Sequence, residues 1–261
     1  MSAKLFAEAI EVEIGARYAR GESMGSLAAT FATSKTVIRN VILRGGGAPR
    51  PRGARCDVET RHDAFDVDGP QTRYWIGFLM ADGCILANGR RTPAVQLALG
   101  PRDIAHVAAF ADFCGARYAG GARASFASAQ ICGRLAEYGI GPRKSGSERA
   151  PECLRMDRDF WRGIVDGDGW VTPRQTIGVC GSKQICVDFA AFAHAIAGSN
   201  VSPVKISGRD CWQVTVHGKG AIKIMRTLYR DGDVALPRKS ATVNVILYDR
   251  MAKSGVSLEA A

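Results

Sequence analysis

Two apolar stretches of the chain share one pattern and predict two similar helices. The stretches are residues 74–83 and 160–169, and each ends in a small residue, an aspartate and a glycine. Gly77 and Ala81 are four positions apart in the first, and Gly163 and Gly167 repeat that spacing in the second. Four positions are about one helical turn, so each pair lies on one face and permits close approach of another helix. The pattern therefore predicts that the two helices pack side by side through these faces.

Asp82 and Asp168 lie in the last turns of the predicted helices. Gly83 and Gly169 follow them, and we expect both glycines to adopt the left-handed conformation that commonly ends a helix. A carboxylate is disfavoured at the negative end of the helix dipole. If the two helices pack through their small faces, the two carboxylates also face each other, and like charges so placed must protonate or bind a cation. This predicts a divalent metal site at the seam between the helices.

The pattern after each aspartate indicates a tandem duplication. Both copies contain strand-like runs and helices, and both close on Pro-Arg-Lys-Ser, at 142–145 and 237–240. In the first copy we expect strands at 84–87 and 94–99, a strand pair near 117–127, and helices at 104–114 and 130–138. In the second copy we expect a strand at 175–180, helices at 184–197 and 222–229, and a hairpin over 204–217. The predicted fold class is α+β, built from two pseudo-symmetric αββαββα halves.

The first 43 residues predict a small bundle of helices. A short helix over 24–31 is followed by a tight turn, and Ser34 is suited to cap a second helix over 35–43. This is the helix-turn-helix layout, in which the second helix contacts DNA. The polar residues expected to make that contact are Ser34, Lys35, Thr36, Arg39 and Asn40. A three-helix bundle with a merely polar outer face has the same pattern.

Residues 44–54 are rich in glycine, proline and arginine and predict a linker, in which Arg50 and Arg52 would follow a DNA backbone. The same composition fits a solvated tether. We therefore divide the chain into a helix-turn-helix domain (1–46), a linker (47–70), a first half (71–156) and a second half (157–261).

Charge and cysteine spacing narrow the classes of function. The net charge of +10 favours a polyanionic partner, although a coding bias toward alanine, glycine and arginine would also raise the arginine content. No apolar run approaches ~20 residues, so no membrane span is expected. The eight cysteines form no CxxC pair, which argues against a structural zinc site. We expect a cytoplasmic protein of a bacterial or phage host cell.

The two motifs and the two basic boxes together resemble the LAGLIDADG homing endonucleases, in the form with an N-terminal helix-turn-helix. The resemblance covers about residues 71–250. It implies that the motif helices cross at a pseudo-twofold axis and that two antiparallel sheets form a DNA-binding saddle. It also implies a monomeric double-strand endonuclease acting on a long asymmetric duplex target, with Mg²⁺ as cofactor and Mn²⁺ as a substitute.

The resemblance also assigns roles to particular residues. It places the catalytic, metal-binding carboxylates at Asp82 and Asp168 and adds the carbonyl groups of Ala81 and Gly167 to the metal shell. Basic side chains near the scissile phosphates would be Lys144 and Lys239. Met80 departs from the motif, whereas the second copy keeps Asp166 at the same position. We expect Trp75 and Trp161 to pack in the core. We expect Arg162 to be exposed on the polar face of its helix, and the alternative is that it contacts DNA.

Further side chains are expected to face the bases because of their placement on strands and turns. These are Arg90, Arg91, Gln96, Arg117, Arg123, Arg174, Gln175, Lys205, Arg209 and Gln213. Two alternatives remain open on the same scaffold: a DNA-binding regulator that does not cleave, and an RNA maturase. A recombinase is less well supported, because no serine or tyrosine nucleophile lies in a basic constellation.

Overall fold

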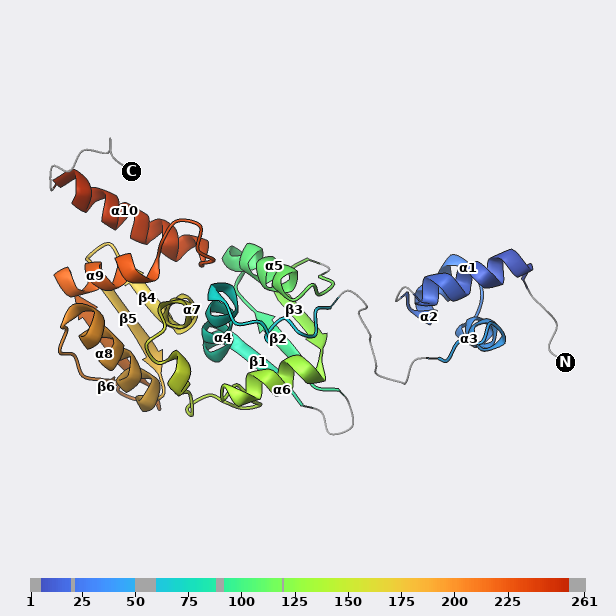
Figure 1. The fold of residues 1–261 in the computed structure, drawn as a ribbon, viewed down its shortest axis with the longest axis horizontal. Coiled ribbons are helices and arrows are strands. Elements are labelled where there is room, and N and C mark those ends of the chain that lie inside the picture. Colours follow the sequence, from blue (N-terminus) through green and yellow to red (C-terminus); the bar gives the residue numbers. More distant parts are fainter. Residues whose placement is uncertain (1–5, 20–21, 50–59, 88–91, 119, 254–261) are drawn as a thin grey trace.

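Two helices in contact form the centre of the larger part of the molecule (Figure 1). The computed structural model describes residues 6–19, 22–49, 60–87, 92–118 and 120–253. Helices α4 (Pro70–Asp82) and α7 (Arg158–Asp168) pack against each other, and an antiparallel sheet lies on the outer side of each. The predicted α+β class is therefore confirmed.

The first half carries a three-stranded sheet in the order β1-β2-β3. Its strands are β1 (Gly83–Leu86), β2 (Ala94–Ala98) and β3 (Arg123–Ala127), and its other elements are η1 (Pro101–Asp103), α5 (Ile104–Phe113), α6 (Ala129–Glu137) and η2 (Glu152–Leu154). Among the described residues, the strand pair expected near 117–127 gives β3 alone. Gly120 and Gly121 have φ of +89° and +96°, so the chain turns there and does not extend a second strand.

The second half carries a four-stranded sheet in the order β4-β5-β7-β6. The strands are β4 (Gly169–Thr172), β5 (Thr176–Gly181), β6 (Val204–Lys205) and β7 (Trp212–His217), and the helices are α8 (Lys183–Ala197), α9 (Gly218–Leu228) and α10 (Pro237–Lys253). From α7 to α9 this half follows the predicted αββαββα order in full. Helix α10 continues beyond it and carries the second Pro-Arg-Lys-Ser box.

One hydrophobic core connects the two halves. Side chains that alternate along the strands, such as Val95 and Phe126 in one sheet and Ile177 and Val216 in the other, are buried beneath helices α5, α6, α8 and α9. Trp75 and Trp161 are completely buried in this core, which confirms their predicted packing. The inward faces of both sheets are thus covered, and their outward faces carry the side chains that remain accessible.

The glycines after the two aspartates do not adopt the expected left-handed conformation. Gly83 has φ −76° and Gly169 has φ −106°, and both continue directly into the following strand. Glycine is required there by close approach instead. A Cβ on Gly83 would lie 2.6 Å from the Leu79 carbonyl oxygen, and one on Gly169 would lie 2.6 Å from that of Gly178. Each helix therefore passes into its strand without a loop, and each aspartate directly precedes the first paired residue of its sheet.

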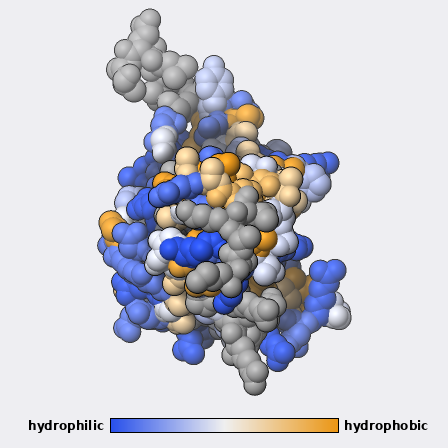
Figure 2. All heavy atoms as spheres, turned by 90° about the vertical axis from the view of Figure 1, so that its right-hand side faces the viewer, coloured by the Kyte–Doolittle hydropathy of each residue, from blue (hydrophilic) through white to orange (hydrophobic). Residues whose placement is uncertain are grey.

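Helices α1 (Glu8–Ala19), α2 (Met24–Thr30) and α3 (Lys35–Arg44) enclose a separate small core that includes Ile14, Leu27 and Ile38. Hydrophilic side chains dominate the described surface on the side of the molecule shown in Figure 2. Ala64 and Phe65, which the sequence analysis placed in the linker, pack in the larger core. In the described part of the chain, no helix is both long and apolar enough to cross a membrane.

Candidate functional site

The seam between α4 and α7 is formed by glycines that let the two backbones touch. A Cβ added to Gly77 would overlap the Phe160 carbonyl oxygen, and one added to Gly163 would overlap that of Tyr74. Nearer the helix ends, a Cβ on Gly167 would overlap the Cβ of Ala81. The predicted packing through the small faces is therefore confirmed. This contact brings the C-terminal ends of both helices to one place.

Asp82 and Asp168 meet at these helix ends. The space beside Gly167 is bounded by the Asp82 carboxyl group, whose Oδ2 would lie 3.4 Å from an added Cβ. Burial raises the pKa of Asp168 to about 6, and the nearby charge of Asp82 acts in the same direction. Part of Asp82 is open to solvent, yet the protein packed around its carboxyl group raises its pKa too, against the opposing effect of Lys239 and Lys144.

The two lysines of the Pro-Arg-Lys-Ser boxes bind the helix ends that carry the aspartates. Lys144 Nζ donates to the Ala81 carbonyl at 2.9 Å. Lys239 Nζ donates to the carbonyls of Val165 and Asp166 at 2.7 Å and to that of Gly169 at 2.6 Å. A cation is favoured at the negative end of a helix dipole. Both lysines therefore stabilise the two ends that place carboxylates where a helix alone disfavours them.

Burial has opposite effects on the two kinds of charge at this site. It lowers the pKa of Lys239 to about 8, and it lowers the pKa of Lys144 in the same direction. The nearby carboxylates oppose this effect on both lysines. Both ammonium groups point at backbone carbonyls, so their contact with a scissile phosphate remains a prediction.

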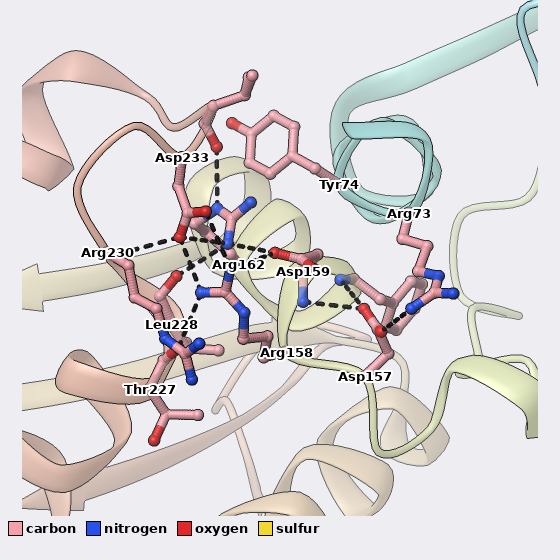
Figure 3. Close-up of polar contacts among 12 residues, drawn as sticks. Arg73, Tyr74, Asp157, Arg158, Asp159, Arg162, Thr227, Leu228, Arg230 and Asp233 are labelled. Atoms are coloured by element: carbon pink, nitrogen blue, oxygen red, sulfur yellow. Dashed lines mark hydrogen bonds and ion pairs between the residues drawn. The ribbon is translucent and has the colours of Figure 1, made fainter. Parts of the chain in front are cut away.

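Arg162 is buried, and the expectation that it is exposed is wrong. Its side chain is 1% accessible and lies against the segment that joins α9 to α10 (Figure 3). The guanidinium donates to Asp159 at 2.6 Å, to Asp233 at 3.1 Å and to the carbonyls of Leu228 and Val234. A buried arginine needs such complete pairing. Sequence pattern could not reveal it, because the accepting carbonyls lie 66 and 72 residues away along the chain.

A second buried polar network crosses the seam and centres on Asp166. Its carboxylate accepts hydrogen bonds from Tyr74 Oη at 2.8 Å, Tyr229 Oη at 2.7 Å and the Leu236 N–H at 2.7 Å. His106 Nε2 lies 2.8 Å from Tyr74 Oη. Since the Tyr74 hydroxyl proton goes to Asp166, the ring nitrogen of His106 is the donor in that contact. Leu236 is three residues before Lys239, so this network also fixes the segment that delivers the lysine.

The Asp166 network was missed from sequence, although a signal for it exists. Tyr74 and Phe160 occupy the same position in the two motifs, three residues before the seam glycine. Met80 and Asp166 likewise share a position, three residues after it. The polar residue is therefore Tyr74 at the first position and Asp166 at the second, one from each copy. Their counterparts, Phe160 and Met80, are both apolar. Comparison of the two copies position by position would have indicated a polar contact across the seam.

The donors at the helix ends fit a divalent cation. Mg²⁺ prefers hard oxygen ligands, and the two carboxylates supply them. Among the described residues no three His, Cys, Asp or Glu side chains converge on one point. The carbonyl groups of Ala81 and Gly167 lie in the same turns as the aspartates, but Lys144 binds the first and Lys239 lies 3.4 Å from the second. Asp82 and Asp168 are thus the ligands that the geometry supports best.

The side chains predicted to face DNA have different surroundings. Arg117, Arg123, Arg174 and Arg209 are exposed, and Gln96 and Gln213 are partly exposed on strands. Gln175 has φ +58° and accepts a hydrogen bond from Arg250, and Lys205 lies 3.7 Å from Asp210. Arg50, Arg52, Arg90 and Arg91 lie outside the described residues.

In the N-terminal unit, the two short helices expected over 24–31 and 35–43 form as α2 and α3, and their role in DNA binding remains a prediction. Ser34 caps α3, with its Oγ accepting from the Val37 N–H at 3.3 Å. Lys35, Thr36 and Arg39 are exposed and Asn40 is partly exposed, whereas the opposite face of α3 packs in the small core. The polar residues thus share the accessible side of the helix.

Comparison with known proteins supports the fold. No protein-family model and no curated protein sequence matches the chain. The structure is similar to that of the homing endonuclease I-WcaI bound to its DNA recognition sequence, with a TM-score of 0.52 and 10% identity, over 75% of this chain and 95% of that chain. The chain has the fold of this homing endonuclease. The LAGLIDADG meganuclease I-AabMI bound to uncleaved DNA has a TM-score of 0.48 at 12% identity, over 72% of this chain and 92% of that one. I-SmaMI bound to an uncleaved DNA target in the presence of calcium ions gives 0.46 at 12% identity, over 74% and 95%.

Proposed function

We propose that this protein is a site-specific DNA endonuclease that hydrolyses one phosphodiester bond in each strand of a long, asymmetric duplex target. The observation that carries the proposal is the convergence of Asp82 and Asp168, from two duplicated helices, between two sheets whose outward faces are open. One carboxylate from each half corresponds to one cut in each strand. The net charge of +10 favours a polyanionic substrate.

Asp82 and Asp168 would hold the divalent metal, Mg²⁺ or Mn²⁺. When bound, the metal supplies charge stabilisation at the phosphate and lowers the pKa of a coordinated water. The chain itself fixes the geometry, because the backbone contact at Gly77 and Gly163 holds α4 and α7 against each other. Lys144 and Lys239 hold the last turns and partly neutralise the two carboxylates, which limits their repulsion before the metal binds.

The test is substitution of each carboxylate by the isosteric amide. Asp82→Asn and Asp168→Asn should each reduce double-strand cleavage at least about 100-fold, because a metal-assisted step supplies several kcal/mol and each ~1.4 kcal/mol is tenfold. DNA affinity should hold or increase, since a carboxylate that faces phosphates repels them. Asp112→Asn, which changes an exposed carboxylate on α5, is the matched control and should cleave normally. EDTA should abolish cleavage by the unchanged chain.

A strand-specific assay distinguishes a shared metal from two independent ones. If one cation is shared at the seam, as we propose from the contact of the helix ends, either substitution stops both cuts. Independent metals would leave each variant able to nick one strand. An unchanged chain that binds a preferred duplex but never cuts it with Mg²⁺ or Mn²⁺ would support the regulator instead. A preference for structured RNA would support the maturase.

A further inference from the structure

The two sheets differ in the chemistry of their outward faces. Opposed residues of an antiparallel pair share a face, so the register identifies each set. The outward face of β1–β3 consists of Cys84, Leu86, Ala94, Gln96, Ala98, Arg123, Ser125 and Ala127. The outward face of β4, β5 and β7 consists of Trp170, Thr172, Thr176, Gly178, Cys180, Gln213, Thr215 and His217.

Hydrogen-bonding capacity is concentrated on the second sheet. On the first face, Gln96, Arg123 and Ser125 are the residues with strong donors or acceptors, three of eight positions. On the second, six of eight positions carry such groups, with Cys180 and Gly178 as the exceptions. Two of the six, the Thr172 and Thr176 hydroxyls, also bond each other. Gly178 also lets the Trp170 ring lie across the face, because a Cβ there would overlap the indole. Base edges are read by such donors and acceptors, so the second sheet is the better equipped for direct readout.

The N-terminal unit is joined to the outer end of the sheet that is poorer in these groups. Strand β1 begins directly after Asp82 and ends at Leu86. Leu86 pairs with Ala94 of β2, and Ala94 pairs in turn with Ala127 of β3. Ser128 follows Ala127 directly, and its Oγ lies 2.9 Å from His62 Nδ1. The chain that arrives from α1–α3 is therefore anchored at the end of the first sheet that is remote from the aspartates.

The reach of that connection is limited. Ten residues, 50–59, separate the described parts, and ten residues span at most about 36 Å. This corresponds to about ten base pairs of B-DNA at 3.4 Å per pair. The exposed polar side of α3 can thus reach DNA that flanks the first half-site.

We propose that the target is read unequally, an inference that rests on the proposed endonuclease function. The sheet of β4–β7 reads the bases of its half-site directly. The half-site under β1–β3 is read less, and α3 compensates by contacting the DNA beyond its outer end. Lys35 and Arg39 on α3 are then determinants of specificity at one flank of the target.

Selection from a random duplex pool, followed by hydroxyl-radical footprinting in Ca²⁺, tests this with full-length protein. The pair Lys35→Ala/Arg39→Ala should lose protection and base preference at one flank, with at least a tenfold loss of affinity. Lys219→Ala/Lys223→Ala is the matched control and should leave the footprint unchanged. It removes two exposed cations at the same spacing from α9, which packs on the face of the second sheet opposite to the proposed DNA-binding face. Thr215→Ala should relax base preference in the half-site on the opposite side from that flank.

The outcomes separate the two proposals. The unequal reading would be overturned if α3 protected the DNA next to the half-site that depends on Thr215, or if it protected both flanks. The proposed endonuclease function would still stand. Equal information content in the two half-sites would have the same consequences. Failure to select any preferred duplex would instead overturn the proposed function.

Discussion

Single glycines decide whether the two halves can meet. At Gly77 the nearest atoms to an added Cβ belong to the Phe160 backbone, which no side-chain rotation can move. Gly77→Ala should therefore lower the free energy of unfolding by about 2–3 kcal/mol. Gly133→Ala is the control, because its added Cβ meets nothing within 4 Å in the interior of α6. It should raise the free energy of unfolding by about 0.5–1 kcal/mol. Urea unfolding measures both variants, and equal changes in the two would contradict the role assigned to Gly77.

His106 gives stability a pH dependence of defined sign. Burial lowers its pKa from 6.5 to about 4, so the folded state binds fewer protons than the unfolded state between these values. Its contribution is fully present above pH 6.5 and is lost as pH falls toward 4. Between pH 7.5 and 5 this amounts to about 2 kcal/mol.

His106→Leu should remove that part of the acid loss. Chemical denaturation of both proteins at pH 7.5 and 5 measures the difference, and His194→Leu, which changes an exposed histidine on α8, is the control. An unchanged acid loss in His106→Leu would show that the imidazole has the same pKa in the folded and unfolded states.

At the scale of elements, the Asp166 network joins α4, α7 and the segment before α10. Tyr74→Phe and Asp166→Asn should each destabilise the protein, because a buried hydrogen bond to a charged group contributes about 1.5–3 kcal/mol. The first change removes this hydrogen bond and the second weakens it, because the amide carries no charge. The double variant should therefore be destabilised by less than the sum, with a difference of about 1 kcal/mol. Tyr118→Phe combined with Asp166→Asn is the control and should be additive. Additivity of the Tyr74 pair in urea unfolding would exclude a direct contribution of this hydrogen bond.

The elements themselves follow closely from the hydrophobic pattern, whereas their junctions do not. Helices such as α5 and α8 form within one or two residues of their predicted bounds, because apolar periodicity and caps are local signals. The predicted conformation of Gly83 and Gly169 was wrong, because crowding by Leu79 and Gly178 is a tertiary effect. The burial of Arg162 depends on Asp233 and on carbonyls brought back by α9, which no local pattern contains. The two aspartates were found because the motif is duplicated, while the capping contacts of Lys239 became visible only in three dimensions.

At the scale of the whole molecule, the described residues form two cores that share no residue. Removal of residues 1–46 deletes the small one together with the exposed cations of α3. The shortened protein should bind its target more weakly and with a shallower salt dependence, by about 0.9 in the log–log slope for each phosphate that α1–α3 neutralises in the full-length protein. Cleavage at saturating enzyme should persist. Titration at several salt concentrations is the measurement, and an unchanged slope would show that α1–α3 neutralises no phosphates.

The pairing of Tyr74 with Asp166 also has an evolutionary consequence. If two copies of the second half packed together, Phe160 of each copy would face Asp166 of the other. Both buried carboxylates would then lack the hydrogen bond that Tyr74 donates. Two copies of the first half would pair Tyr74 with Met80, and each Tyr74 hydroxyl would keep only its contact with His106. Each half has therefore become complementary to the other, and neither could form the Tyr74–Asp166 hydrogen bond with a second copy of itself. A chimera that keeps this hydrogen bond must therefore exchange α4 and α7 together.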